Sequence, residues 1–138
     1  MADPFLVNIA DRPDLEKPGA DGKRAVPGLS DDAPMMDKAR GTTRYLGREA
    51  AEGGVDGPFA YYSDRPAGDV IPMHRHSANR TEFLISGSIE WREPGKKPRV
   101  YGAGTLSHVE AGTIYGYKVL EDARILIVFD GPPGINLV

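Results

Sequence analysis

The sequence predicts an all-β domain, a sandwich or barrel of many short strands. The 138 residues include 17 glycines and 12 prolines, which fall at short intervals along the chain. The stretches between them are rich in β-branched and aromatic residues, and none has a sustained helical periodicity. With 40% hydrophobic residues, a chain of this length can bury one core but not two. We therefore expect a single all-β domain.

The first 40 residues differ from the rest of the chain. Residues 11–34 are rich in Asp, Lys, Pro and Gly, and the main apolar run before them is Phe5-Leu6-Val7. A segment of this composition cannot form a core of its own. We predict that residues 1–40 form an extended N-terminal arm and residues 41–138 the barrel. The arm is expected to cover part of the barrel or of a partner chain in a homodimer.

The barrel strands follow one another between turn signals. Ser86-Gly87-Ser88 is expected to reverse one strand into the next as a hairpin, and residues 94–98 to form a longer exposed loop. The strands are expected at residues 42–46, 59–63, 69–76, 80–85, 88–93, 99–101, 105–109, 114–119 and 124–129.

Charge and composition exclude several classes of function. The formal charge is −3, with both signs mixed along the chain, so no basic stripe is available for nucleic acid. The absence of cysteine excludes disulfides, thiolate zinc sites and cysteine nucleophiles. No apolar run reaches membrane-spanning length, and the start lacks a signal-peptide profile. We expect a soluble cytoplasmic protein with no nucleic-acid or membrane partner.

His74 and His76 are the strongest candidates for a site. They lie two residues apart in an expected strand, so both side chains point to the same face. Two imidazoles on one face can bind a divalent transition metal, and Pro72 fits the edge or the first residues of a strand. The alternative is a metal-free polar lining of the barrel.

The following strands add charged candidates to this face. Arg80 and Glu82 share one side of their strand, and Glu93 shares a row with Ile89 and Trp91. Arg80 could bind a substrate carboxylate bidentately or lie at an exposed rim. Glu93 points inward in one interpretation and lies at the solvated end of its strand in the other.

Two segments of the chain form recognisable motifs. The first is carried by Gly68, His74, His76, Glu82, Leu84, Ile85 and Gly87, and the second by residues 104–115. Together they resemble the conserved motifs of the cupin superfamily, over residues 41–132. That resemblance implies a double-stranded β-helix, a jelly-roll-like barrel, and commonly a homodimer.

The chain departs from the cupin pattern at two ligand positions. Arg80 occupies the usual glutamate position, and Tyr115 replaces the third histidine. The sequence is most similar to single-domain cupins related to 2,4′-dihydroxyacetophenone dioxygenase and acetylacetone dioxygenase, which also lack that glutamate. The resemblance implies that Glu93 supplies the acid, and that a non-haem metal, with iron favoured over Mn, Ni or Zn, supports oxygen-dependent cleavage beside a carbonyl.

The leading hypothesis is a metal-dependent, oxygenase-like enzyme acting on a carbonyl, phenolic or enolic substrate. His74 and His76 would hold the metal with Glu93 or Glu82, and the third position would fall to Tyr115, His108 or water. Arg80 would recognise an anionic group of the substrate. Two alternatives are a lyase or isomerase without oxygen chemistry, with Tyr115 as general acid or base, and a binding or sensing module for a small acid.

Overall fold

The computed structural model describes residues 3–15, 40–51, 55–134 and 136–137, and nearly all of their regular structure is β. The one helix among them is a 3-10 turn, η1 (Ile9–Asp11), so no helix in these ranges is long and apolar enough to cross a membrane. The strands are β1 (Thr42–Tyr45), β2 (Arg48–Glu49), β3 (Val55–Gly57), β4 (Phe59–Arg65), β5 (Val70–Arg75), β6 (Arg80–Arg92), β7 (Arg99–Gly102), β8 (Leu106–Val109), β9 (Tyr115–Phe129) and β10 (Asn136–Leu137).

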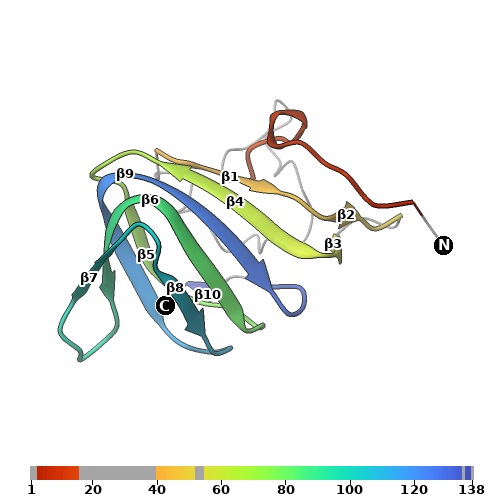
Figure 1. The fold of residues 1–138 in the computed structure, drawn as a ribbon. Helices are drawn as coiled ribbons and strands as arrows, with labels where there is room; N and C mark the ends of the chain where they lie inside the picture. Colours follow the sequence, from red (N-terminus) through yellow and green to blue (C-terminus); the bar gives the residue numbers. More distant parts are fainter. Residues whose placement is uncertain (1–2, 16–39, 52–54, 135, 138) are drawn as a thin grey trace.

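Two long bent strands, β6 and β9, organise the whole molecule (Figure 1). The first half of β6 and the second half of β9 pair with each other, and β8, β4 and β1 extend this sheet. The other halves of β6 and β9 also pair, and β7, β5 and β10 extend the second sheet. All these pairs are antiparallel. The predicted all-β architecture is confirmed.

The predicted hairpin at Ser86-Gly87-Ser88 is wrong. Residues 80–92 form one strand, and its register with β9 shifts between Leu84 and Ile89, where the strand bends from one sheet to the other. Gly87 has φ +88°, and a Cβ there would collide with the carbonyl oxygens of β9, 2.7 Å from that of Glu121. The glycine thus serves a bend against a neighbouring strand instead of a chain reversal.

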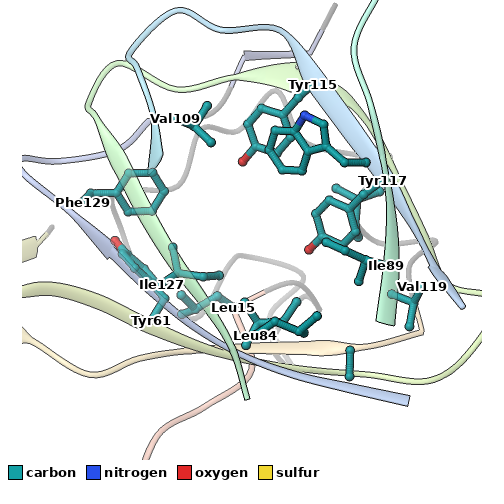
Figure 2. Close-up of a cluster of buried hydrophobic side chains, with 14 of the residues drawn as sticks. Leu15, Tyr61, Leu84, Ile89, Val109, Tyr115, Tyr117, Val119, Ile127 and Phe129 are labelled. Atoms are coloured by element: carbon teal, nitrogen blue, oxygen red, sulfur yellow. The ribbon is translucent and has the colours of Figure 1, made fainter. Parts of the chain in front are cut away.

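The core lies between the two sheets. The alternation of β6 and β9 turns one row of each strand inward, and Figure 2 shows side chains from both sheets around a common interior. Leu84, Ile89, Val119 and Ile125 are fully buried. Leu15, from the N-terminal segment, is also fully buried in this core. Leu15 thus anchors the N-terminal segment in the barrel, whereas Phe5 and Leu6 of the predicted apolar run are exposed. Residues 16–39 of the predicted arm lie outside the described ranges.

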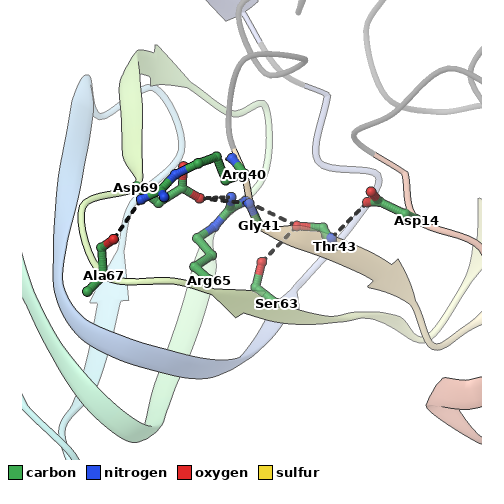
Figure 3. Close-up of polar contacts among 8 residues, drawn as sticks. All are labelled: Asp14, Arg40, Gly41, Thr43, Ser63, Arg65, Ala67 and Asp69. Carbon is green, nitrogen blue, oxygen red and sulfur yellow. Dashed lines mark hydrogen bonds and ion pairs between the residues drawn. The ribbon is translucent and has the colours of Figure 1, made fainter.

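A buried polar cluster fixes the start of β5 (Figure 3). The Asp69 carboxylate accepts hydrogen bonds from the backbone N–H groups of Arg40 (2.8 Å) and Gly41 (3.0 Å), and it forms an ion pair with Arg65 at 3.0 Å. Both Asp69 and Arg65 are buried, so each charge is compensated by the other. The chain entering β1 is thereby tied to β5, the strand that carries His74 and leads to His76.

Candidate functional site

The two histidines lie at the end of β5, beside the first residue of β9. The register of β5 against β9 is irregular between Ile71 and His74, and this places His74 directly opposite Tyr115. Pro72 lies within the irregular stretch, where a missing N–H is tolerated. His76 follows the end of β5 and points to the same side as His74, as the spacing predicted, because their ring centroids are 4.8 Å apart.

Backbone carbonyl groups fix the tautomer of both rings. Nδ1 of His74 lies 2.7 Å from the carbonyl oxygen of Pro72, and Nδ1 of His76 lies 2.6 Å from that of Gly134. Because a carbonyl oxygen can only accept, each Nδ1 carries a proton and donates it. In the neutral ring, Nε2 then presents a lone pair, as in a metal-binding histidine oriented by a backbone carbonyl.

The two Nε2 atoms face each other at 3.1 Å. Burial lowers the pKa of His74 to about 4 and that of His76 to about 3, so both rings are neutral near neutral pH. Two lone pairs at this distance cannot hydrogen-bond with each other. Metal–nitrogen bonds of about 2.0–2.1 Å would separate two ligand nitrogens by roughly 2.9 Å at a right angle and roughly 3.4 Å at a tetrahedral angle. The pair thus fits one transition-metal ion.

Tyr115 brings an oxygen to the same place. Its hydroxyl lies 3.1 Å from Nε2 of His76, and its ring is stacked on Trp91 with 4.3 Å between centroids and 10° between planes. Nη1 of Arg80 donates to the Tyr115 hydroxyl oxygen. The phenol is therefore held from three sides, and its oxygen faces a cation.

Arg80 points into the barrel, and a carboxylate of the protein neutralises it. Nη2 of Arg80 lies 2.6 Å from Oε2 of Glu82, whose other oxygen accepts from the Tyr101 hydroxyl at 3.0 Å. Glu82 is fully buried, and Arg80 is 4% exposed. A lone cation beside the histidines would repel a metal ion, but this pair carries no net charge. Nε of Arg80 is buried and has no hydrogen-bond partner among the described residues.

The structure does not bring the predicted acid ligands to the histidines. The Glu82 carboxylate forms an ion pair with Arg80 and accepts a hydrogen bond from Tyr101. Glu93, just beyond the end of β6, accepts a hydrogen bond from Trp91 and forms an ion pair with Lys96. Within residues 3–15, 40–51, 55–134 and 136–137, no group of three or more His, Asp or Glu side chains could hold a metal ion. The centre is therefore a two-histidine pair with a phenol beside it, instead of two histidines with a carboxylate.

His108 is the last candidate from the sequence, and two further residues contact the site. His108 lies on an exposed position of β8 and contacts Thr81, so it does not replace the missing third histidine. Trp91 stacks on Tyr115 and Tyr101 donates to Glu82, and neither was predicted from the sequence as a site residue. The shared row of Trp91 and Ile89 was the available signal for the first, whereas the contact of Tyr101 with Glu82 depends on the pairing of β7 with β6.

Comparison with known proteins identifies the architecture. No protein-family model and no curated protein matches the sequence. The polyketide cyclase RemF from Streptomyces resistomycificus superposes with a TM-score of 0.64 at 16% identity, over 99% of this chain and 86% of that chain. KdgF from Halomonas sp. gives 0.52 at 18% identity, over 64% and 78%. An RmlC-like cupin from Shewanella frigidimarina gives 0.53 at 16% identity, over 64% and 74%. Together with the paired, bent strands β6 and β9, these similarities show that the chain has the cupin fold, a double-stranded β-helix.

Proposed function

We propose that this protein is a metal-dependent small-molecule enzyme whose metal is held by His74 and His76. The observation that carries the proposal is the pair of Nε2 lone pairs facing each other at 3.1 Å inside the barrel. Both Nδ1 protons are committed to backbone carbonyl groups, so both Nε2 lone pairs are directed into the site. The lone pair of His76 also lies within hydrogen-bond reach of the Tyr115 hydroxyl, and a bound metal ion would replace that contact. Imidazole donors suit iron, nickel and zinc, and the motif resemblance favours iron, with manganese as a further candidate.

The neighbouring residues support chemistry on a carbonyl or enolate. A divalent metal at the histidines would polarise a carbonyl oxygen or stabilise an enolate, and iron would also admit oxygen chemistry. The Tyr115 hydroxyl, 3.1 Å from Nε2 of His76, would exchange its proton with a substrate bound at the metal. Arg80 donates to that oxygen and so would stabilise negative charge on it.

A lyase or isomerase without oxygen chemistry is the second candidate. It is favoured by the hydrogen bond from Arg80 to Tyr115, because a phenol beside a cation suits an acid–base catalyst. The polyketide cyclase among the structural relatives agrees with such chemistry. Measurement of oxygen uptake during turnover separates the two candidates, because only the oxygenase consumes oxygen. Tyr115→Phe should abolish turnover in the lyase while leaving the metal bound.

Elemental analysis of the purified protein tests the assumption that both candidate functions share, a metal ion held by His74 and His76. We expect about one transition-metal ion per chain in the wild type, and almost none in His74→Ala or His76→Ala. His108→Ala is the matched control, since it removes an exposed imidazole and should leave the metal content unchanged. A wild-type protein that stays metal-free after incubation with iron, manganese, nickel and zinc would favour the metal-free binding module instead.

A further inference from the structure

A pocket of about 580 Å³ opens beside the histidine centre, between the loop after β6, strand β7 and strand β8. Its size is in the range of small-molecule binding sites. We call it the β7–β8 pocket. Its lining includes Trp91, Tyr101 and Val109 on the inner side, and Glu93, Lys96 and Arg99 from the end of β6, the following loop and the start of β7.

Two lining residues of this pocket are also wall residues of the centre. Trp91 lines the pocket, and its indole also stacks on Tyr115 at 4.3 Å. Tyr101 lines the pocket, and its hydroxyl donates to Glu82, the partner of Arg80. Trp91 therefore separates the β7–β8 pocket from Tyr115, and Tyr101 together with Glu82 separates it from Arg80.

Two cations share one carboxylate at the loop end of this pocket. Glu93 lies 2.8 Å from Nζ of Lys96 and 3.7 Å from Nη2 of Arg99, and it also accepts from the Trp91 indole at 2.9 Å. Hydrogen bonds from Lys96 and Trp91 lower the pKa of Glu93, so the carboxylate is ionised. Lys96 and Arg99 are 68% and 73% exposed, which leaves their donors accessible. A second acid, Glu110, lines the pocket from the segment after β8.

We propose that the β7–β8 pocket binds a flat organic anion, an aromatic or enolic carboxylate. The ring lies against Trp91 and Tyr101, and the carboxylate takes Lys96 and Arg99 as partners. An arginine and a lysine on accessible positions suit a carboxylate, and an aromatic wall suits a planar group. This inference goes beyond the proposed function, because Trp91 separates the pocket from Tyr115 and the anion would occupy a site distinct from the metal centre.

The protein contains one tryptophan, Trp91, so tryptophan fluorescence reports on the wall shared by this pocket and Tyr115. Titration of the full chain with benzoate should change Trp91 emission saturably, and calorimetry should give the same affinity. Benzamide keeps the ring and lacks the charge, and we expect it to bind at least about tenfold more weakly. Cyclohexanecarboxylate keeps the charge and lacks the flat ring, and it should bind several-fold more weakly. Equal binding of benzamide and benzoate, or no binding by either method, would overturn the proposal.

Variants separate this site from the metal centre. Lys96→Gln/Arg99→Gln should weaken benzoate at least about tenfold, whereas Arg124→Gln, an exposed arginine of β9 outside the pocket lining, should bind it like the wild type. Unchanged benzoate affinity in the double variant would contradict the proposal. His74→Ala should lose metal and still bind benzoate. A wild type that binds benzoate but no metal would refute the proposed enzyme and leave the β7–β8 pocket as a binding site.

Discussion

Burial of His74 and His76 as neutral rings should make the metal-free protein sensitive to acid. Their pKa values fall from 6.5 to about 4 and about 3, so below pH 6.5 the unfolded chain binds protons that the folded chain does not. The contribution of the two neutral rings to the free energy of unfolding is therefore fully present above pH 6.5. It is lost as the pH falls toward the lowered pKa values of the folded state. We expect the free energy of unfolding to drop by about 1.4 kcal/mol per pH unit for each histidine.

Urea unfolding of the metal-free protein at several pH values between 6.5 and 4 measures this slope. His74→Gln and His76→Gln should each remove about half of the excess slope, because each eliminates one buried titratable ring. A wild-type slope that survives in both variants would show that other groups cause the acid sensitivity.

The buried pair of Arg80 and Glu82 should behave as one unit. Glu82→Gln leaves the Arg80 charge without its carboxylate, and we expect a loss of about 3–5 kcal/mol in unfolding free energy. The double variant Arg80→Met/Glu82→Met removes both charges and should lose less than the sum of the single variants. Chemical denaturation of all four proteins gives the coupling energy. Additive losses would mean that the two side chains do not depend on each other.

The sequence predicted part of this centre, for a physical reason. Side-chain alternation along a strand is local, so the common direction of His74 and His76 and the inward direction of Arg80 followed from residue spacing. By contrast, Glu82 pairs with Arg80 and accepts a hydrogen bond from Tyr101 of the neighbouring strand β7, and these contacts depend on the tertiary arrangement. The carbonyl of Gly134, which fixes His76, lies 58 residues further along the chain. No local pattern encodes such partners.

At the level of the strands, the same limit explains the wrong hairpin. A Ser-Gly-Ser stretch satisfies the local requirements both of a turn and of a bend within a strand, since each needs a residue with positive φ. The continuous pairing with β9 selects the bend, and the opposing β9 residues lie far along the chain, as Glu121 lies 33 residues from Ser88. The two β9 segments expected at 114–119 and 124–129 likewise merge into one strand, Tyr115–Phe129.

Gly87→Ala should therefore be far more damaging than the same change at a turn. At Gly87 the new Cβ meets backbone oxygens of β9 in addition to a φ of +88°. Gly95 is the matched control, since it has φ +74° and nothing within 4 Å of the new Cβ. We expect Gly95→Ala to cost about 1–2 kcal/mol and Gly87→Ala clearly more, as measured by chemical denaturation. Equal losses at both positions would contradict the packed bend.

At the level of the whole molecule, one outer sheet face carries an unusual concentration of exposed apolar side chains. Leu106, Phe83 and Leu126 stand in one register row across β8, β6 and β9, and they are 62%, 40% and 37% exposed. Val128 and Ile85 lie on the same strands and are also exposed. Exposed patches of this kind mark interaction surfaces.

We propose that this face is the interface of a homodimer. Arg124 and Asp64 are exposed cross-strand neighbours on the same sheet, so the patch of each chain carries a cation and an anion that can meet their opposites on a second copy. A two-fold interface requires such self-complementarity, because each chain presents the same patch to the other. Phe83→Glu should therefore shift the protein toward monomer in sedimentation velocity. Val70→Glu is the control, since Val70 is equally apolar and 52% exposed but belongs to the other sheet, on β5. A wild-type protein that sediments as a monomer, or a Phe83→Glu variant that remains dimeric, would contradict the assignment of this face.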